Sequence, residues 1–209
     1  GSLSIGFVGA AIYDILPSIV REYRKKFPRV SVALHELSTP DQVHALHDNR
    51  IDIGFLRPPI PTQLLELEPI QRLSCTLCLP KAHPLAEKDE IHIEDLRDEP
   101  FVFITRPVWP ALYDTILSLC REVGFSPRIV QEATEYQTVM GLVAAGIGIT
   151  VIPVSANKLY KTEVVYKELY DSNFVAEMSV AYKKMNSNPE LLEFLKIARE
   201  KKRIEVEDE

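Results

Sequence analysis

The feature that most constrains this chain is the alternation of strand-like and helix-like segments in its N-terminal part. Apolar residues alternate over residues 3–7 and 30–34, as on one face of a strand, and a third apolar run covers 51–55. Between these runs, apolar side chains recur at helical spacing over 16–27, and Thr39-Pro40-Asp41 has the pattern of a helix start, with Thr39 as the N-cap. The order strand, helix, strand, helix, strand predicts a parallel sheet with right-handed crossovers.

A similar pattern begins again after the proline-rich stretch 58–61. The expected elements of this second part are strands at 73–79, 101–104, 128–132, 147–152 and 164–169, and helices at 110–124 and 134–146. A last strand at 178–182 and a helix after Asn188-Pro189-Glu190 are expected to return to the first part.

These segments predict an α/β fold of two Rossmann-like lobes. Lobe I is expected to comprise residues 1–72 plus 173–209, and lobe II residues 73–172, with two strands crossing between them. In doubly wound sheets, ligands bind outside the carboxyl ends of the strands. We therefore expect a ligand cleft between the lobes.

The composition narrows the possible partners. No apolar run reaches the roughly 18 residues needed to span a bilayer, and the start of the chain lacks the basic and apolar regions of a signal peptide. We expect a cytoplasmic protein with no membrane partner. A formal charge of −6 argues against nucleic-acid binding by these residues alone, because a basic surface is needed to neutralise phosphates. Gly1-Ser2 is typical of a tag-removal scar, and a strand pattern begins at Leu3, so a further segment is expected upstream.

Motifs for catalysis, cofactors and metals are absent from the sequence or lie in the wrong context. Gly146-Ile147-Gly148 lies between a helix and the following strand, whereas a dinucleotide fingerprint lies between a strand and the following helix. Cys75 and Cys78 share a predicted strand and have thiols on opposite faces. His44 and His47 share a helical face but lack two further metal ligands. We therefore expect a binding module, with no enzymatic activity, cofactor or metal.

The turns at the carboxyl ends of the strands contain groups that suit an anion. Backbone N–H groups and the helix dipole favour negative charge at the starts of the first two helices, at Gly9-Ala10-Ala11 and Ser38-Thr39. Arg57, directly after the third strand, has a planar fork that suits a carboxylate. The corresponding turn of lobe II is 106–110. The candidate ligand-binding residues are therefore Gly9, Ala10, Ala11, Ser38, Thr39, Arg57, Arg106, Pro107, Trp109, Pro110 and Met178.

Several candidates also have a purely structural explanation. Thr39 fits equally well as an N-cap alone, Arg57 as a surface arginine, and Trp109 as a core anchor at a helix entry. Residues 134–137 begin another helix whose N-terminus is a further candidate for the cleft. The pattern alone leaves open which of these side chains face the cleft and which face the core.

Taken together, a series of short motifs resembles the effector-binding domain of LysR-type bacterial transcriptional regulators. In chain order the motifs are Ile5-Gly6-Phe7-Val8-Gly9, Leu16-Pro17, Phe27-Pro28, Arg50-Ile51-Asp52-Ile53-Gly54-Phe55, His83-Pro84-Leu85 and residues 141–153, so the similarity covers essentially the whole chain. The resemblance implies a type 2 periplasmic-binding-protein-like fold with an effector site between its lobes. It also implies a winged helix-turn-helix domain before Leu3, through which the full-length protein binds DNA.

The resemblance assigns roles to several residues. Thr39 and Arg57 fall on positions that commonly contact carboxylate effectors in this family, and the turn at 107–110 supplies the opposite wall. Ala10 departs from the family pattern, because many relatives have serine or threonine there, and a hydroxyl contact is lost. The resemblance further implies a side-by-side antiparallel homodimer, formed by the first helix of one lobe and the Leu112–Cys120 helix of the other, and a homotetramer of the full-length protein.

More than one ligand class remains open. Residues 19–28 and 129–137 resemble activators of acetoin biosynthesis in Gram-positive bacteria, which implies an acetate-like carboxylate and control of acetoin or acetolactate pathway genes. Residues 6–17 and 141–153 are similar to regulators of aromatic catabolism, which implies a muconate-like diacid. A transport-type solute-binding protein is a third alternative, because it has a similar two-lobed plan.

Overall fold

The chain divides into two compact units in the computed structural model, which describes residues 1–13, 15–153, 160–170, 172 and 174–204. Unit 1 comprises Gly1–Arg72 and Glu177–Glu209, and unit 2 comprises Leu73–Ala176. The chain therefore passes between the units twice. It re-enters unit 1 at Glu177, four residues after the expected position 173, because the strand that returns the chain still belongs to unit 2 at its start.

Unit 1 is built on a sheet whose first three strands have the βαβαβ order. β1 (Ser2–Phe7) pairs in parallel with β2 (Ser31–Glu36) on one side and with β3 (Ile53–Leu56) on the other. β9 (Val175–Lys183) is antiparallel to β3, and β4 (Leu65–Pro80) lies between β9 and the short β10 (Arg203–Ile204). The sheet order is therefore β10-β4-β9-β3-β1-β2.

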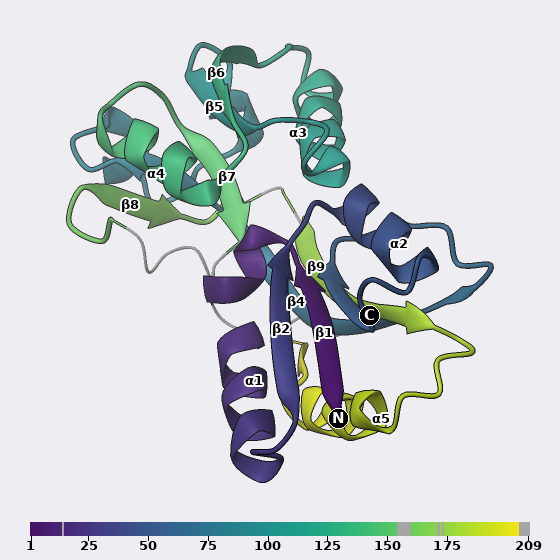
Figure 1. The fold of residues 1–209 in the computed structure, drawn as a ribbon. Coiled ribbons are helices and arrows are strands. Elements are labelled where there is room, and N and C mark those ends of the chain that lie inside the picture. Colours follow the sequence, from purple (N-terminus) through teal and green to yellow (C-terminus); the bar gives the residue numbers. More distant parts are fainter. Residues whose placement is uncertain (14, 154–159, 171, 173, 205–209) are drawn as a thin grey trace. The chain divides into compact units, whose positions relative to one another are not determined.

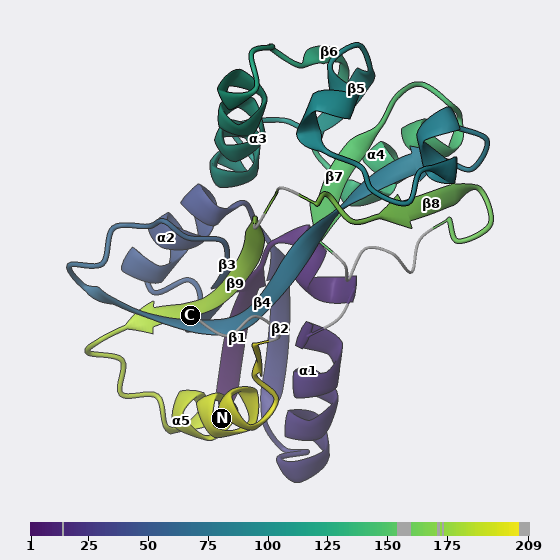
Figure 2. The ribbon, with the colours of Figure 1, turned by 180° about the vertical axis from the view of Figure 1, so that it is seen from behind.

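Helices bury the apolar side chains of this sheet. They are η1 (Gly9–Tyr13), α1 (Ile15–Lys26), α2 (Thr39–His47) and α5 (Pro189–Glu200). α1 packs against α5, as both views show (Figures 1 and 2), and α2 contacts β1 and β3. The ring of Phe194 on α5 lies 5.3 Å from that of Tyr23 on α1 and 6.1 Å from that of Phe55 on β3. All three side chains are fully buried, and each such burial stabilises the fold by roughly 1.5–3 kcal/mol.

Unit 2 contains a second parallel pair of strands and an antiparallel group. The parallel pair is β5 (Pro100–Ile104) with β6 (Arg128–Ala133), and β7 (Thr150–Pro153) and β8 (Val164–Lys167) are antiparallel to the distal part of β4. Its helices are η2 (Pro84–Glu87), η3 (Ile93–Leu96), α3 (Pro110–Glu122) and α4 (Tyr136–Ala144). Gly146 follows α4 with a φ of 81°, which glycine adopts without the steric penalty of a Cβ.

The predicted strand at 73–79 is only the distal half of β4, which is 16 residues long and begins at Leu65. Leu65 to Glu68 alternate as in a strand, but Pro69 and the adjacent polar residues Gln71 and Arg72 break the alternation, and the first half was therefore missed. Figure 2 shows β4 as one continuous strand. The two crossings of the chain are therefore made by β4 and by β9.

Three predicted helix starts were wrong in detail. Ser38, not Thr39, is the N-cap of α2, and its hydroxyl accepts a hydrogen bond from Asp41 N at 3.2 Å. The N-cap of α4 is Glu135, not Thr134. Gly9-Ala10-Ala11 open a separate 3-10 helix of five residues, whereas α1 begins at Ile15.

Candidate functional site

The carboxyl ends of the three parallel strands meet at one edge of unit 1. Phe7 of β1 lies in register with Glu36 of β2 and with Phe55 of β3. Two residues after this row, the three chain segments reach, in turn, Gly9, Ser38 and Arg57. The fold therefore brings the turns that contain these candidates to the same sheet edge, which is where α/β sheets bind ligands.

Thr39 and Arg57 are joined directly. The Oγ1 atom of Thr39 accepts a hydrogen bond from the backbone N–H of Arg57 at 3.2 Å. Because Ser38 already caps α2, the Thr39 hydroxyl is not needed for that purpose. A threonine hydroxyl that accepts one bond still has its own proton to donate. Thr39 therefore ties the loop after β2 to the end of β3 and can offer an O–H donor to an anion.

Arg57 is held at the end of β3 by a second contact. Its Nη1 atom donates a hydrogen bond to the backbone carbonyl of Glu177 at 3.2 Å, and its side chain is partly buried. A guanidinium has five N–H donors in a planar fork, which matches the two oxygens of a carboxylate. Thr39 and Arg57 thus combine a hydroxyl donor with a positioned cation.

Gln42 braces this edge of the sheet. Its side chain is fully buried, and its Nε2 atom donates to Leu37 O at 3.0 Å and to Phe55 O at 2.9 Å. These two carbonyls set the orientation of the amide, and they belong to the segments that lead into Thr39 and Arg57. The Oε1 atom has no hydrogen-bond partner within the described part of the chain and lies over Gly54, where a Cβ would clash with it.

Sequence reasoning missed Gln42, although a signal was present. Gln42, Ala45 and Leu46 have the spacing of one helical face, and all three are buried. A polar residue in an otherwise apolar stripe must find buried partners, because an unpaired amide in the core is costly. Here the carbonyls at the ends of β2 and β3 supply them.

The other candidates of unit 1 face inward or are engaged locally. Ala10 packs against the core, Ala11 is buried, and the backbone N–H of Ala11 donates to Val8 O at 3.0 Å. Met178 is buried in the same core, one position from Ser179, which pairs with Leu56. These residues pack in or against the hydrophobic core of unit 1, and their side chains provide no hydrogen-bond donor for an anion.

In unit 2, the side chains of Arg106 and Trp109, in the turn at 106–110, contact other residues of the same unit. Arg106 is exposed and forms a two-bond ion pair with Asp114, with distances of 2.8 and 2.9 Å, and its hydrogen bond lowers the pKa of the Asp114 carboxyl. The indole of Trp109 is buried edge-on against Tyr136 at 6.2 Å, and it lies 6.3 Å from the ring of Phe174. Pro110 opens α3, and Pro107 is exposed. Trp109 is therefore a core anchor.

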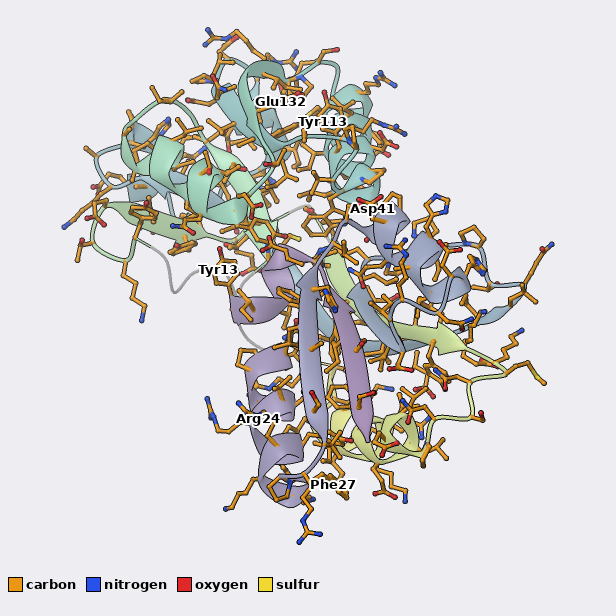
Figure 3. The ribbon with its side chains drawn as sticks, viewed as in Figure 1. Tyr13, Arg24, Phe27, Asp41, Tyr113 and Glu132 are labelled. Carbon is orange, nitrogen blue, oxygen red and sulfur yellow. The ribbon has the colours of Figure 1, made fainter. Side chains whose placement is uncertain are left out.

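Unit 2 also contains a neighbouring phenol and carboxylate. Tyr113 on α3 and Glu132 on β6 are labelled in Figure 3, and burial together with the nearby Glu132 carboxylate raises the pKa of the Tyr113 phenol. Such a phenol stays protonated near neutral pH. The neutral Tyr113 phenol therefore adds a dipole, and no charge, to the electrostatics of unit 2.

A second cationic feature of unit 1 lies elsewhere. A pocket of about 300 Å3 is lined by Ser18, Glu200, Lys201, Lys202 and Arg203. The Nζ atom of Lys201 is 3.0 Å from a carboxylate oxygen of Glu22, so part of this charge is already neutralised within the unit. The pocket is a second group of cations against which the Thr39 and Arg57 pair can be compared.

The remaining titratable groups were compared with the requirements of a metal site and of a reactive thiol. Among the described residues, no cluster of three or more His, Cys, Asp or Glu side chains could hold a metal ion. Burial raises the pKa of the Cys78 thiol to about 12 and that of Cys120 to about 11, which suppresses the reactive thiolate. Within the same residues, none of the helices has the length and apolarity required to cross a bilayer.

A sheet whose parallel strands end at a hydroxyl and a guanidinium is typical of α/β domains that bind small molecules. The chain belongs to the LysR substrate binding domain family, whose model matches residues 1–203. The resemblance to LysR-type effector-binding domains is thereby confirmed.

Two curated relatives show the range of the similarity. The chain is 50% identical over 198 residues to the HTH-type transcriptional regulator AlsR of Bacillus subtilis, covering 95% of this chain and 66% of that protein. It is 34% identical over 192 residues to the HTH-type transcriptional regulator CatR of Pseudomonas putida, covering 90% of this chain and 64% of that protein. The chain thus spans a little under two thirds of these regulators.

Solved structures confirm the predicted fold class. The effector-binding domain of BenM with its effector benzoate has a TM-score of 0.82 and 27% identity, covering 95% of this chain and 90% of that chain. The effector-binding domain of QuiR in complex with shikimate reaches a TM-score of 0.85 at 19% identity, covering 96% of each chain, and supports the fold alone. The chain has the type 2 periplasmic-binding-protein-like fold of LysR effector-binding domains.

Proposed function

We propose that this chain is the effector-sensing domain of a cytoplasmic LysR-type transcriptional regulator and that it binds a small carboxylate at Thr39 and Arg57. The observation that supports this most is the hydrogen bond from the backbone N–H of Arg57 to Thr39 Oγ1, which joins the residue with a hydroxyl donor to the residue with a guanidinium at the carboxyl ends of β2 and β3. The relatives named as transcriptional regulators favour this function over a transport-type solute-binding protein.

Acetate is the effector that we propose first. The 50% identity to AlsR supports an activator of acetoin or acetolactate pathway genes, in agreement with the acetoin-type motifs at 19–28 and 129–137. The muconate-like diacid remains the alternative, and the similarity to CatR keeps it open. Benzoate, the effector bound to BenM, is also a carboxylate, so the chemistry expected of Arg57 is shared by these ligands.

Regulation requires that the ligand discriminate between two states of the whole protein. A ligand that binds both states equally shifts nothing, however tight its binding is. We propose that carboxylate binding favours one arrangement of a homodimer of this domain, within a homotetramer of the full-length protein. This arrangement would change how an N-terminal helix-turn-helix domain binds DNA. Ala10 places a methyl group where a hydroxyl would add a donor, so Thr39 and Arg57 supply the polar contacts of this proposed site.

Isothermal titration calorimetry tests the ligand and the residue together. Acetate and cis,cis-muconate are titrated into the native chain, into Arg57→Ala, and into Arg24→Ala, which removes an exposed arginine from the last turn of α1 (Figure 3). We expect Arg57→Ala to abolish binding and Arg24→Ala to leave it unchanged. Undiminished carboxylate binding by Arg57→Ala would remove Arg57 from the site.

A further inference from the structure

The two places where the chain passes between the units are joined by one ion pair. Arg72 is the last residue of unit 1 before β4 enters unit 2, and Glu177 is the first residue of unit 1 when β9 returns. The Nε atom of Arg72 lies 2.8 Å from Oε1 of Glu177, and the two side chains are 26% and 28% exposed. This partial burial makes the pair less screened by solvent than an exposed pair such as Arg106 with Asp114.

Glu177 is also the residue that holds Arg57. Its backbone carbonyl accepts the hydrogen bond from Arg57 Nη1 at 3.2 Å, and its Oε2 atom accepts one from Ser179 Oγ at 3.3 Å. Each of its three acceptor oxygens therefore has a named partner: the carbonyl has Arg57, Oε1 has Arg72 and Oε2 has Ser179. Glu177 therefore contacts both the guanidinium of the candidate site and the arginine at the other chain crossing.

We propose that Glu177 and Arg72 act as positioning residues for the anion site, and that through them the occupancy of Arg57 is coupled to both crossing strands. This inference rests on the proposed function. Glu177 fixes the orientation of the guanidinium through its carbonyl. An anion that engages Arg57 changes the bond to that carbonyl, and Arg72 links the affected residue on β9 to β4.

The positive charge of Arg72 is expected to affect the affinity of the site for an anion. The carboxylate of Glu177 is on the same residue as the carbonyl that binds Arg57, so its negative charge opposes the arrival of a second anion there. Arg72 neutralises that carboxylate. Loss of Arg72 alone therefore leaves an uncompensated negative charge near the site, whereas loss of both charges removes the repulsion.

A double-mutant cycle tests this coupling. Acetate affinity is measured by calorimetry for the native chain, Arg72→Met, Glu177→Gln and the double variant, with thermal unfolding as a check that each is folded. Interaction energies between contacting residues predict that Arg72→Met weakens binding about 3- to 10-fold alone and by much less in the Glu177→Gln background. The control is Arg199→Met, which breaks the ion pair with Glu68 elsewhere in unit 1. Equal losses in both backgrounds, or no loss in either, would overturn the proposal.

Hydrogen exchange of the ligand-free chain provides an arm that is independent of the effector. Arg57→Ala, and the milder Arg57→Lys, are expected to raise the exchange rate of backbone amides across 175–180 relative to Arg24→Ala, because the Arg57 contact to Glu177 is weakened or lost. Unchanged exchange in both variants overturns the coupling even if acetate binds. If the native chain binds no carboxylate, the proposed function fails, and this arm alone decides whether Arg57 is coupled to the crossing strand.

Discussion

At the scale of single residues, Ser38 and Thr39 have similar side chains and different tasks. Ser38 caps α2 through Asp41 N, and Thr39 accepts the backbone N–H of Arg57. The sequence predicted both residues at a helix start that favours an anion. The pattern could not decide whether Thr39 acts only as an N-cap or also contacts a ligand. Only the position of β3 beside α2, which is a tertiary contact, shows that Thr39 has a second partner.

The two substitutions are therefore expected to have separate effects. Ser38→Ala should destabilise the domain by about 1 kcal/mol through loss of the cap and leave acetate affinity unchanged. Thr39→Val should lower acetate affinity, by an amount on the order of one hydrogen bond, or about 0.5–1.5 kcal/mol. Urea unfolding and calorimetry measure the two quantities. A loss of affinity in Ser38→Ala equal to that in Thr39→Val would contradict this division.

The three thiols are expected to differ in reactivity. Cys78 and Cys120 are fully buried with raised pKa values, whereas Cys75 is partly exposed. The thiolate is the nucleophile, so iodoacetamide at about pH 8 should label Cys75 well before the other two. Mass spectrometry of the native and the urea-unfolded chain gives the site of labelling. Labelling of Cys78 at the rate of Cys75 in the native chain would contradict the burial of the Cys78 thiol.

At the scale of elements, Gln42 and Gly54 form a matched pair across α2 and β3. Gly54→Ala places a Cβ against Gln42 Oε1, and the amide can move away only by weakening its bonds to Leu37 O and Phe55 O. We expect a cost of about 1–3 kcal/mol, as for other overpacked cores. In a Gln42→Ala background the same substitution should cost less. Additive free energies of unfolding in the two backgrounds, measured in urea, would argue against this packing.

Elements with a clear apolar period could be predicted from the sequence, and those without one could not. The segments α1, β1 and β3 were found because their apolar residues repeat at 3.6 or form short buried runs. The proximal half of β4 was missed because Pro69 and the adjacent Gln71 and Arg72 break the alternation that begins at Leu65. Two charged side chains of this half form ion pairs, Glu68 with Arg199 and Arg72 with Glu177, which are long-range contacts that no local pattern reveals.

At the scale of the whole molecule, two exposed apolar side chains lie on strands at the ends of the sheets. β2 is at the end of the unit 1 sheet and exposes Leu34 at 44%, and β6 is at the end of its strand pair and exposes Val130 at 42%. Unpaired edge strands with apolar side chains favour association. They are adjacent in the chain to α1 and α3, the helices from which the homodimer was predicted.

The predicted homodimer can be tested through these two strands. Sedimentation should give a dimer for the native chain, and Leu34→Glu or Val130→Glu should shift it to the monomer. Leu192→Glu, on the exposed side of α5 at 57% exposure, is the matched control and should leave the dimer intact. A native chain that is monomeric at high concentration, or a dimer that neither glutamate disturbs, would exclude this interface.

The proposed effector site requires that a carboxylate bind at the strand ends of unit 1. Backbone amide shifts in a nuclear magnetic resonance titration with acetate locate it directly. We predict that the largest saturable shifts belong to Thr39, Asp41 and Arg57, at the strand ends of unit 1, and that they disappear in Arg57→Ala. Saturable shifts confined instead to Ser18 and residues 200–203, at the cationic pocket, with those three amides unmoved, would contradict a carboxylate site at Thr39 and Arg57.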